Sequence, residues 1–345
     1  MTMTFDTHRV EQPSALASGS ESAIVARKLR RTFKGGIEAV RDIDLAVSTG
    51  EVFGFLGPNG AGKTTTVRML CTLLPPTAGT AMVAGLDVVR EAAQVRRRIG
   101  VALQEIGLDP VQTGRELLEL QCGLYGITGR LATTRADELL ELVGLTDAAE
   151  RRTKTYSGGM KRRLDLASAL VHAPDVLFLD EPTTGLDPAS RLTIWDEVRR
   201  INAGGATVFL TTQYMEEADK LCDRVAIIDN GQIVADGTPE QLKAEMGRDV
   251  VSVSLDGADP AATEAALGGL PGLERVAAEP GALALYVEDG ASSIPEIVRR
   301  LDRDRILVGA ISVARPSLDD VFLKATGRRL EGQQRSSQEL EEVSR

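Results

Sequence analysis

The chain has few cysteines, and their spacing excludes two classes of small, cross-linked domain. Its 345 residues include three cysteines, which are Cys71, Cys122 and Cys222. They lie far apart in the sequence and form neither a CxxC metal pair nor a dense disulfide framework. The spacing therefore argues against a zinc module or a disulfide scaffold, and it fits a reducing cytosol.

The chain also lacks any long apolar run. A membrane-crossing helix needs about 18 or more consecutive apolar residues, and no stretch of the sequence approaches that length. Residues 1–22 are polar and contain no secretory apolar core, so we expect them to form a disordered leader. Any attachment to a membrane is therefore expected to come through a partner protein.

The chain also has fewer basic than acidic residues. The chain has 40 Lys and Arg against 50 Asp and Glu, which gives a formal net charge of -10. A protein that holds nucleic acid generally neutralises its phosphates with a broad basic face. The composition therefore predicts no nucleic-acid partner.

The sequence contains enough material for two folded domains, because 43% of its residues are apolar. Over residues 23–247, short apolar segments alternate with helical patterns, which is typical of an α/β fold with a mostly parallel sheet. The strand candidates in this range are residues 51–56, 176–179, 207–210 and 225–228. Helical periodicity at residues 114–124 and 131–143 predicts an inserted helical subdomain over about 104–170.

The pattern changes over residues 248–327, where the order of expected elements is βαββαβ. That order predicts a small, ferredoxin-like α+β accessory domain. The expected elements are strands at 250–255, 273–277, 283–287 and 308–314, and helices at 260–267 and 294–301. A last helix is expected from Ser317, which forms a capping box with Asp320, and the charged residues 328–345 are expected to be disordered.

A glycine-rich motif follows the first strand of the α/β region and precedes a predicted helix. It matches the phosphate-binding pattern G-x-x-x-x-G-K-[ST], whose glycine amides surround phosphate oxygens at a helix N-terminus. In that pattern the lysine supplies a point charge and the hydroxyl residue binds Mg²⁺. The matching residues are Gly57, Pro58, Asn59, Gly60, Ala61, Gly62, Lys63 and Thr64, followed by Thr65 in the helix.

Two acidic residues follow a buried-strand run at residues 176–179. They emerge at the carboxyl end of the predicted sheet, where active sites of parallel sheets form. We expect Asp180 to hold Mg²⁺ and Glu181 to polarise an attacking water as general base. Lys63, Glu181 and Mg²⁺ would then share one site for nucleotide hydrolysis.

A second glycine motif lies between these two segments and consists of Tyr156, Ser157, Gly158, Gly159 and Met160. Its Ser-Gly-Gly core at a helix N-terminus forms a second anion site. The motif resembles the signature of ABC ATPases, with Tyr in place of the usual Leu and Met in place of the usual Gln. The resemblance implies a P-loop NTPase fold that binds ATP and Mg²⁺, and a homodimer in which the signature of one copy closes on ATP held by the other.

Other positions resemble the family's landmarks in the expected order. The resemblance implies that Phe33 stacks on adenine and that Gln104 contacts Mg²⁺ and introduces the segment facing a permease. Asp187, within the sequence Gly-Leu-Asp-Pro, would belong to the loop that crosses the dimer. The position of the usual switch histidine carries Gln213, and neither His8 nor His172 is placed to replace it. We hypothesise that the amide of Gln213 keeps the γ-phosphate contact, although it cannot become cationic.

The Gln213 substitution and the terminal segment Pro-Ser-Leu-Asp-Asp-Val-Phe at 316–322 resemble the daunorubicin-resistance type of ABC exporter ATPase. That resemblance implies two ATPase chains beneath two separate permease chains, peripheral on the cytoplasmic face of the membrane, exporting drugs, antibiotics or lipids. Two other functions stay open: a soluble ABC-type mechanical ATPase without transport, and a nucleotide-binding regulator that hydrolyses little. The accessory domain either extends the dimer interface or regulates its closure.

Overall fold

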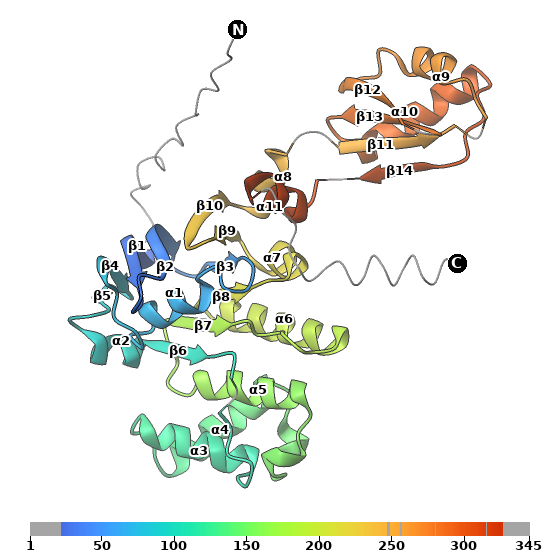
Figure 1. The fold of residues 1–345 in the computed structure, drawn as a ribbon. Coiled ribbons are helices and arrows are strands. Elements are labelled where there is room, and N and C mark those ends of the chain that lie inside the picture. The colour runs from blue at the N-terminus through green and yellow to red at the C-terminus, as the bar shows by residue number, and fades with distance from the viewer. Residues whose placement is uncertain are drawn as a thin grey trace.

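The computed structural model describes residues 22–105, 107–246, 249–255, 257–279, 281–314 and 316–326. The expected leader, apart from Ser22, and the expected tail at 328–345 lie outside the described residues. Within the described part of the chain, no helix combines the length and the apolar character that a membrane crossing requires. Figure 1 shows a main body and a smaller module.

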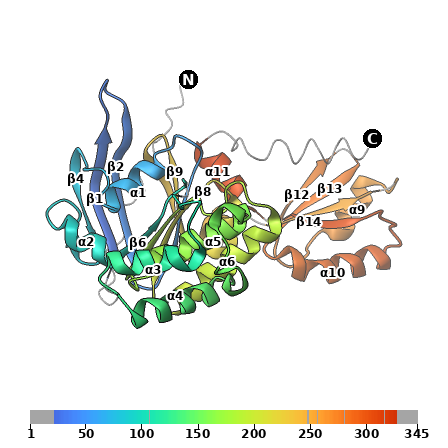
Figure 2. The same cartoon turned by 90° about the horizontal axis from the view of Figure 1, so that it is seen from below.

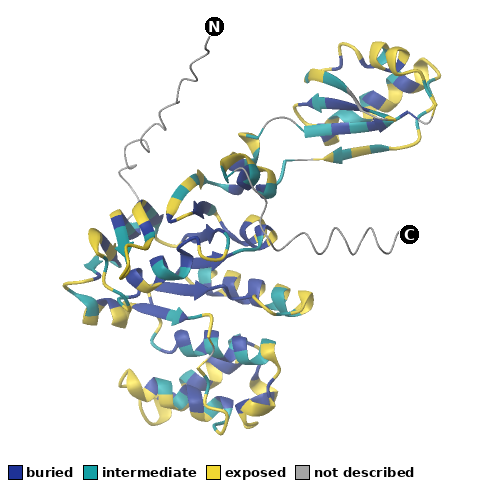
Figure 3. Cartoon of the chain, viewed as in Figure 1, coloured by how far each residue is buried: buried dark blue, intermediate teal, exposed yellow. Residues whose placement is uncertain are grey.

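A six-stranded sheet forms the centre of the main body, with the strand order β10-β9-β3-β8-β7-β6. Strands β9, β3, β8, β7 and β6 pair in parallel, and β10 closes one edge in antiparallel orientation. The strands are β3 (Val52–Leu56), β6 (Ile99–Ala102), β7 (Val176–Asp180), β8 (Thr207–Thr212), β9 (Arg224–Asp229) and β10 (Gln232–Gly237). Every residue of β3, β7 and β8 is buried, which explains the apolar runs at 52–56, 176–179 and 208–210 within them (Figure 3).

Alternate side chains of the central strands enter two different cores. Phe178 lies in one core with the stacked pair Phe53 and Phe209, whose ring centroids are 5.5 Å apart. Leu177 and Leu179 enter the other core. The first core also contains an antiparallel sheet in the order β2-β1-β4-β5. Its strands are β1 (Ser22–Thr32), β2 (Glu38–Ser48), β4 (Ala78–Val83) and β5 (Leu86–Asp87), and the adjoining helices are α1 (Lys63–Leu70) and α2 (Ala92–Arg98).

The second core joins the central sheet to a group of helices (Figure 2). The helices expected at 114–124 and 131–143 are present as α3 (Gly114–Leu124) and α4 (Arg130–Leu142). Thr113 starts α3 with a capping box to Glu116, which fixes that boundary. The remaining helices are α5 (Gly158–Ala169), α6 (Pro188–Ala203), α7 (Met215–Leu221) and α8 (Pro239–Ala244), with 3-10 turns at Thr146–Ala148 and Thr153–Thr155.

The smaller module has the predicted βαββαβ order and a four-stranded antiparallel sheet in the order β12-β13-β11-β14. Its elements are β11 (Asp249–Ser254), α9 (Pro260–Leu267), β12 (Leu273–Glu279), β13 (Ala282–Val287), α10 (Gly290–Arg303) and β14 (Ile311–Ala314). Helix α10 begins four residues before the predicted 294–301 because Asp289 caps it by accepting from the Ser292 amide. The module has its own core, which includes Val251, Leu285 and Ile297.

The last described helix, α11 (Leu318–Thr326), does not join that module's core. Its buried side chains Leu318, Val321 and Phe322 lie in the second core of the main body, beside α7 and α8 (Figure 1). The predicted capping box is present, because the Ser317 amide donates to the Asp320 carboxylate at 2.8 Å and the Asp320 amide donates back at 3.3 Å. We therefore propose that α11 be counted with the main body, although residues 248–327 were expected to form one accessory domain.

Candidate functional site

The loop between β3 and α1 turns through glycines that no other residue could replace without strain. A Cβ on Gly57 would meet the Ile228 carbonyl oxygen at 2.3 Å, and one on Gly62 would meet the Ala39 carbonyl oxygen at 2.4 Å. Gly62, which caps α1, has φ 108° and supplies no side-chain hydrogen bond. First-turn amides of α1 therefore lack a side-chain cap and can receive an anion.

Lys63 is buried at the start of α1 and points back across the loop. Its Nζ donates to the Gly57 carbonyl at 2.8 Å and to the Pro58 carbonyl at 3.1 Å. The same Nζ forms an ion pair with Glu181 Oε1 at 3.0 Å. Two of the predicted catalytic residues therefore contact each other directly.

Asp180 ends β7 directly before Glu181, and the residue is 1% exposed. Its Oδ1 accepts from Thr211 Oγ1 at 2.6 Å and from Thr64 Oγ1 at 3.2 Å. Its Oδ2 is buried and has no hydrogen-bond partner within the described ranges. An oxygen-only donor set with one unpartnered carboxylate oxygen fits Mg²⁺, which prefers hard oxygen ligands.

Glu181 follows in a left-handed backbone conformation with φ 49°, which is costly for a residue with a side chain. Its amide donates to the Thr211 carbonyl at 3.1 Å and lies 3.0 Å from the Thr211 hydroxyl, so β8 fixes this turn. Its second carboxylate oxygen accepts from Thr184 Oγ1 at 3.2 Å. The turn places the carboxylate against Lys63.

The signature loop, residues 156–160, differs from the phosphate-binding loop because most of it lies on the surface, at the start of α5. Ser157 is exposed and caps α5 by accepting from the Met160 amide at 3.2 Å. No hydrogen bond or ion pair among the described residues joins Ser157, Gly158 or Gly159 to the phosphate-binding loop. The candidate site within one chain is therefore incomplete with respect to this motif.

Tyr156 explains one departure from the usual signature sequence. Its ring is buried, and its hydroxyl donates to the Ala148 carbonyl at 2.7 Å. A Cβ on Gly114 would lie 2.5 Å from that hydroxyl, so the glycine at the start of α3 leaves room for the tyrosine. The Tyr therefore anchors the signature loop to the helical group through contacts that a Leu cannot make.

The other predicted residues lie outside the loop, and Thr65 follows it directly in α1. Phe33 is 38% exposed and lies beneath the Arg31 guanidinium, 4.8 Å from the ring centroid. Gln104 is exposed after β6, and Gln213 is half-buried after β8. Asp187 caps α6, where hydrogen bonds from Ser190 hold the pKa of its carboxyl below the usual value. Thr65 is half-buried in α1.

Two contributors were missed from the sequence. Thr211 contacts both Asp180 and Glu181, and only the strand register, which pairs Asp180 with Thr211, places it there. Arg162, in α5, donates to the carbonyls of Asp180 and Pro182 on either side of Glu181. The sequence shows three basic residues after the signature, at 161–163. It does not show that the Arg162 side chain points into the interior.

Family models match two parts of the chain. Residues 40–184 match the ABC transporter family, and residues 237–326 match the C-terminal domain of DrrA1-3-like ATP-binding proteins. Among solved structures, an ATP-binding subunit of an ABC transporter has a TM-score of 0.59 at 26% identity, covering 65% of this chain and 92% of that one. The dimeric, post-hydrolysis state of the ATP-binding cassette MJ0796, with ADP and Pi, has a TM-score of 0.58 at 26% identity, covering 62% and 98%.

The fold and the ordered motifs thus define an ABC-type ATPase, which binds and hydrolyses ATP. The daunorubicin resistance ATP-binding protein DrrA3 of Streptomyces coeruleorubidus is 48% identical over 85% of this chain and 92% of the relative. The linearmycin resistance ATP-binding protein LnrL of Bacillus subtilis is 39% identical over 84% and 94%. The chain belongs to the DrrA-like family of ABC transporter ATP-binding proteins.

Proposed function

We propose that this chain supplies the ATP hydrolysis that drives export of a drug, antibiotic or lipid through a separate permease. The observation that carries the hydrolytic part is the buried group of Lys63, Asp180 and Glu181 at the end of the phosphate-binding loop. The cargo class rests on relatives named for daunorubicin and linearmycin resistance and for Nod factor export. The runner-up function is a soluble ABC-type switch without transport.

In this proposal each residue of the loop has a role set by its position. Phosphate oxygens accept from the loop amides and from Lys63, which exchanges its ion pair with Glu181 for the phosphate. Released from Lys63, Glu181 accepts a proton from the attacking water. Gln213 donates its amide to the γ-phosphate, and Phe33 stacks on the adenine ring.

Mg²⁺ would be held by Thr64, Asp180 and Gln104. When bound, it would neutralise charge on the β- and γ-phosphates. Thr64 and Asp180 already contact each other, whereas Gln104 lies exposed at the end of β6. Gln104 would complete the set with its side-chain carbonyl oxygen, a hard ligand of the kind that Mg²⁺ prefers.

We further propose a homodimer in which the exposed signature of one copy faces the phosphate-binding loop of the other. The separation of the two motifs within one chain supports this arrangement. A solved relative is described as a dimeric post-hydrolysis state. Ser157, Gly158 and Gly159 would contact the γ-phosphate from across the interface, and Asp187 would lie at the crossing loop.

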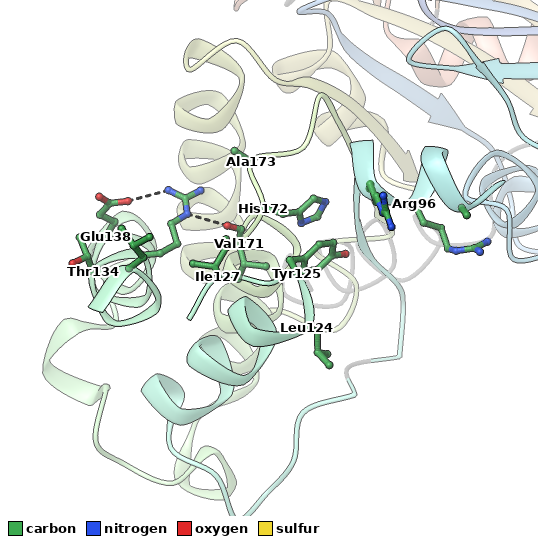
Figure 4. Close-up of a pocket in the computed structure, with 13 residues that line it drawn as sticks. Arg96, Leu124, Tyr125, Ile127, Thr134, Glu138, Val171, His172 and Ala173 are labelled. Carbon is green, nitrogen blue, oxygen red and sulfur yellow. Dashed lines mark hydrogen bonds and ion pairs between the residues drawn. The ribbon is translucent and has the colours of Figure 1, made fainter. Parts of the chain in front are cut away.

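A groove of about 1000 Å³ between α2 and the ends of α3 and α4 supports a permease partner. Leu124 and Leu131, at its border, are 72% and 73% exposed. Figure 4 shows His172 lying flat against Tyr125 in this groove, with ring centroids 3.9 Å apart. His172 therefore packs against the end of α3, and its Nε2 lies 3.0 Å from the Ile99 carbonyl. Arg96 and Arg97 add positive charge, so the groove suits an apolar helix that carries an acidic residue.

Substitution of Glu181 by Gln tests the hydrolytic role. The variant keeps the shape of the side chain, so it should bind ATP, lose steady-state hydrolysis by about 10² to 10⁴-fold and accumulate as an ATP-bound dimer. Turnover under saturating ATP and size-exclusion chromatography with ATP measure the two effects. Hydrolysis close to that of the wild type would remove the general-base role from Glu181.

Substitution of Leu124 by Asp tests the groove. The full chain carrying Leu124→Asp should recover less permease from detergent-solubilised membranes while keeping its basal ATPase activity. Leu307→Asp is the matched control, because Leu307 is 86% exposed in the smaller module. Equal recovery of the permease by both variants would contradict docking at the groove, and recovery of ribosomes or DNA-repair proteins instead would favour the soluble switch.

A further inference from the structure

The Arg162 side chain connects three separate elements beneath the candidate site. It arises from α5, five residues after Ser157, and its side chain is only 6% exposed. Its Nε donates to the Pro182 carbonyl at 3.0 Å, and one terminal nitrogen donates to the Asp180 carbonyl at 3.1 Å. The other terminal nitrogen donates to the Leu103 carbonyl at 2.5 Å and contacts Asp165 at 3.2 Å.

The carbonyl partners stand next to residues with proposed roles. The carbonyls of Asp180 and Pro182 flank Glu181, whose backbone is held in the strained left-handed conformation. The Leu103 carbonyl immediately precedes Gln104. One guanidinium therefore fixes the backbone on both sides of Glu181, the proposed general base, and directly before Gln104.

Such a contact requires arginine. Burial lowers the pKa of Arg162, while Asp165 and Asp180 act in the opposite direction, so placing the group here costs free energy. The planar guanidinium donates along several fixed directions, whereas an ammonium is a compact charge without that geometry. An apolar side chain at this position would leave the carbonyls of Leu103, Asp180 and Pro182 without this donor.

We propose that Arg162 is a positioning residue that couples the signature helix to Glu181 and Gln104. This inference rests on the proposed function, since it assigns the coupling to the general base and to a signature that engages the second copy. When Ser157 contacts nucleotide across the dimer, α5 is held in one position. The guanidinium transmits that position to the two backbone segments, so the carboxylate is aligned only when the signature is engaged.

The experiment compares Arg162→Lys with Arg163→Lys in the full chain. Arg163 follows on the same helix, but its guanidinium donates to the carbonyls of Val143 and Gly144, which lie at the end of α4. Affinity for a fluorescent ATP analogue, kcat, KM and Tm are measured for both variants. Lysine keeps the charge and most of the length, so both proteins should fold.

Arg162→Lys should lower kcat by about 10²-fold, because misalignment of a reacting group has effects of this size. Its KM and ATP affinity should change less than about twofold, since Arg162 makes no contact with the phosphate-binding loop. Arg163→Lys should keep kcat within about threefold at a comparable loss of Tm. Equal kcat values for the two variants would overturn the coupling role.

A double-mutant cycle separates coupling from local damage. Ser157→Ala should reduce kcat strongly in the wild type but by less than about threefold in the Arg162→Lys background, because the signal from Ser157 is already lost. Fully multiplicative effects would overturn the inference. Glu181→Gln separates failure of this inference from failure of the proposed function. If Glu181→Gln abolishes hydrolysis while Arg162→Lys hydrolyses normally, only the coupling role of Arg162 fails. If Glu181→Gln hydrolyses ATP normally, the proposed function fails and the coupling role fails with it.

Discussion

The two glycine motifs of the candidate site differ in how far the folded chain prepares them. The phosphate-binding loop is closed over buried partners, with Lys63 bonded to two loop carbonyls and to Glu181. The signature loop is exposed, and Ser157 contacts only its own helix in the described structure. The phosphate-binding loop is thus a preformed half of the site, and the signature loop is an open half. This difference fits the proposed reaction, which starts only when two chains meet.

The largest effect is expected from Lys63→Ala, which removes the charge at the centre of the prepared half-site. The substitution also leaves Glu181 buried without its cation, so both ATP binding and turnover should fall. We expect kcat/KM for ATP to drop by roughly 10³-fold or more. Steady-state ATPase assays and nucleotide titration measure the two losses. An Lys63→Ala protein that retained most of its ATPase activity would remove the distinction between the two loops.

A somewhat smaller loss is expected from Gln213→Ala. Gln213 makes no hydrogen bond or ion pair with Lys63, Asp180 or Glu181 in the described structure, so its proposed partner is the nucleotide itself. Loss of a donor aimed at the transition state should lower kcat by about 10² to 10³-fold with little change in ATP affinity. Single-turnover hydrolysis measures this directly. Unchanged turnover would show that the amide does not replace the usual histidine.

A mixing experiment tests whether the open half-site is completed by a second copy. Lys63→Ala and Ser157→Arg homodimers should each be inactive, but a heterodimer of the two contains one intact composite site. Because mass action places half of the dimers in the mixed form, a one-to-one mixture should recover about a quarter of wild-type activity. The ATPase rate of the mixture is compared with the sum of the separate variants. No gain above that sum would contradict a site shared between chains.

The smallest effect concerns the stability of the signature helix. Burial raises the pKa of Asp165 on α5 from 3.8 to about 6, and this outweighs the neighbouring Arg162. A raised carboxyl pKa means that the folded state binds the proton more tightly. Its contribution to the free energy of unfolding is therefore greatest below about pH 4 and is lost as the pH rises to about 6.

Asp165→Asn should remove that pH dependence, which amounts to about 3 kcal/mol for a shift of roughly two units. Urea unfolding of both proteins at several pH values between 4 and 7 measures the difference. The wild type should lose stability relative to the variant over this range. Parallel curves would show that burial does not raise the pKa of Asp165 in the folded protein.

The sequence predicted the phosphate-binding loop and the α/β and βαββαβ patterns because each depends on local spacing. The strand before Gly57 falls where it was predicted, whereas α1 begins at Lys63, two residues before the predicted start at Thr65. The strand predicted at 176–179 is β7, which extends by one residue to include Asp180. The contact between Lys63 and Glu181 did not follow from either motif alone. It arises because β3, β8 and β7 are neighbours in the sheet, which brings distant carboxyl ends together.

Features that depend on packing across elements could not be predicted. The Tyr156 hydroxyl donates to the Ala148 carbonyl, which lies in a 3-10 turn. Arg162 donates to three carbonyls at or just after the ends of β6 and β7. The left-handed backbone at Glu181 has no sequence signal, since glutamate does not favour it. The packing of α11 against the main body also depends on contacts across elements, and it was not predicted. The capping box shows where this helix begins, but it does not show which core the helix joins.

The position of α11 determines how the smaller module can be removed. Because α8 and α11 pack in the same core, the module is an insertion anchored at both ends and not an appendage. A stop codon after residue 247 would therefore delete Leu318 and Phe322 from the core of the ATPase itself. A clean excision would replace residues 249–314 with a short glycine-serine bridge and leave α11 in place. Only that protein would separate a dimerising or regulatory contribution of the module from simple loss of the fold.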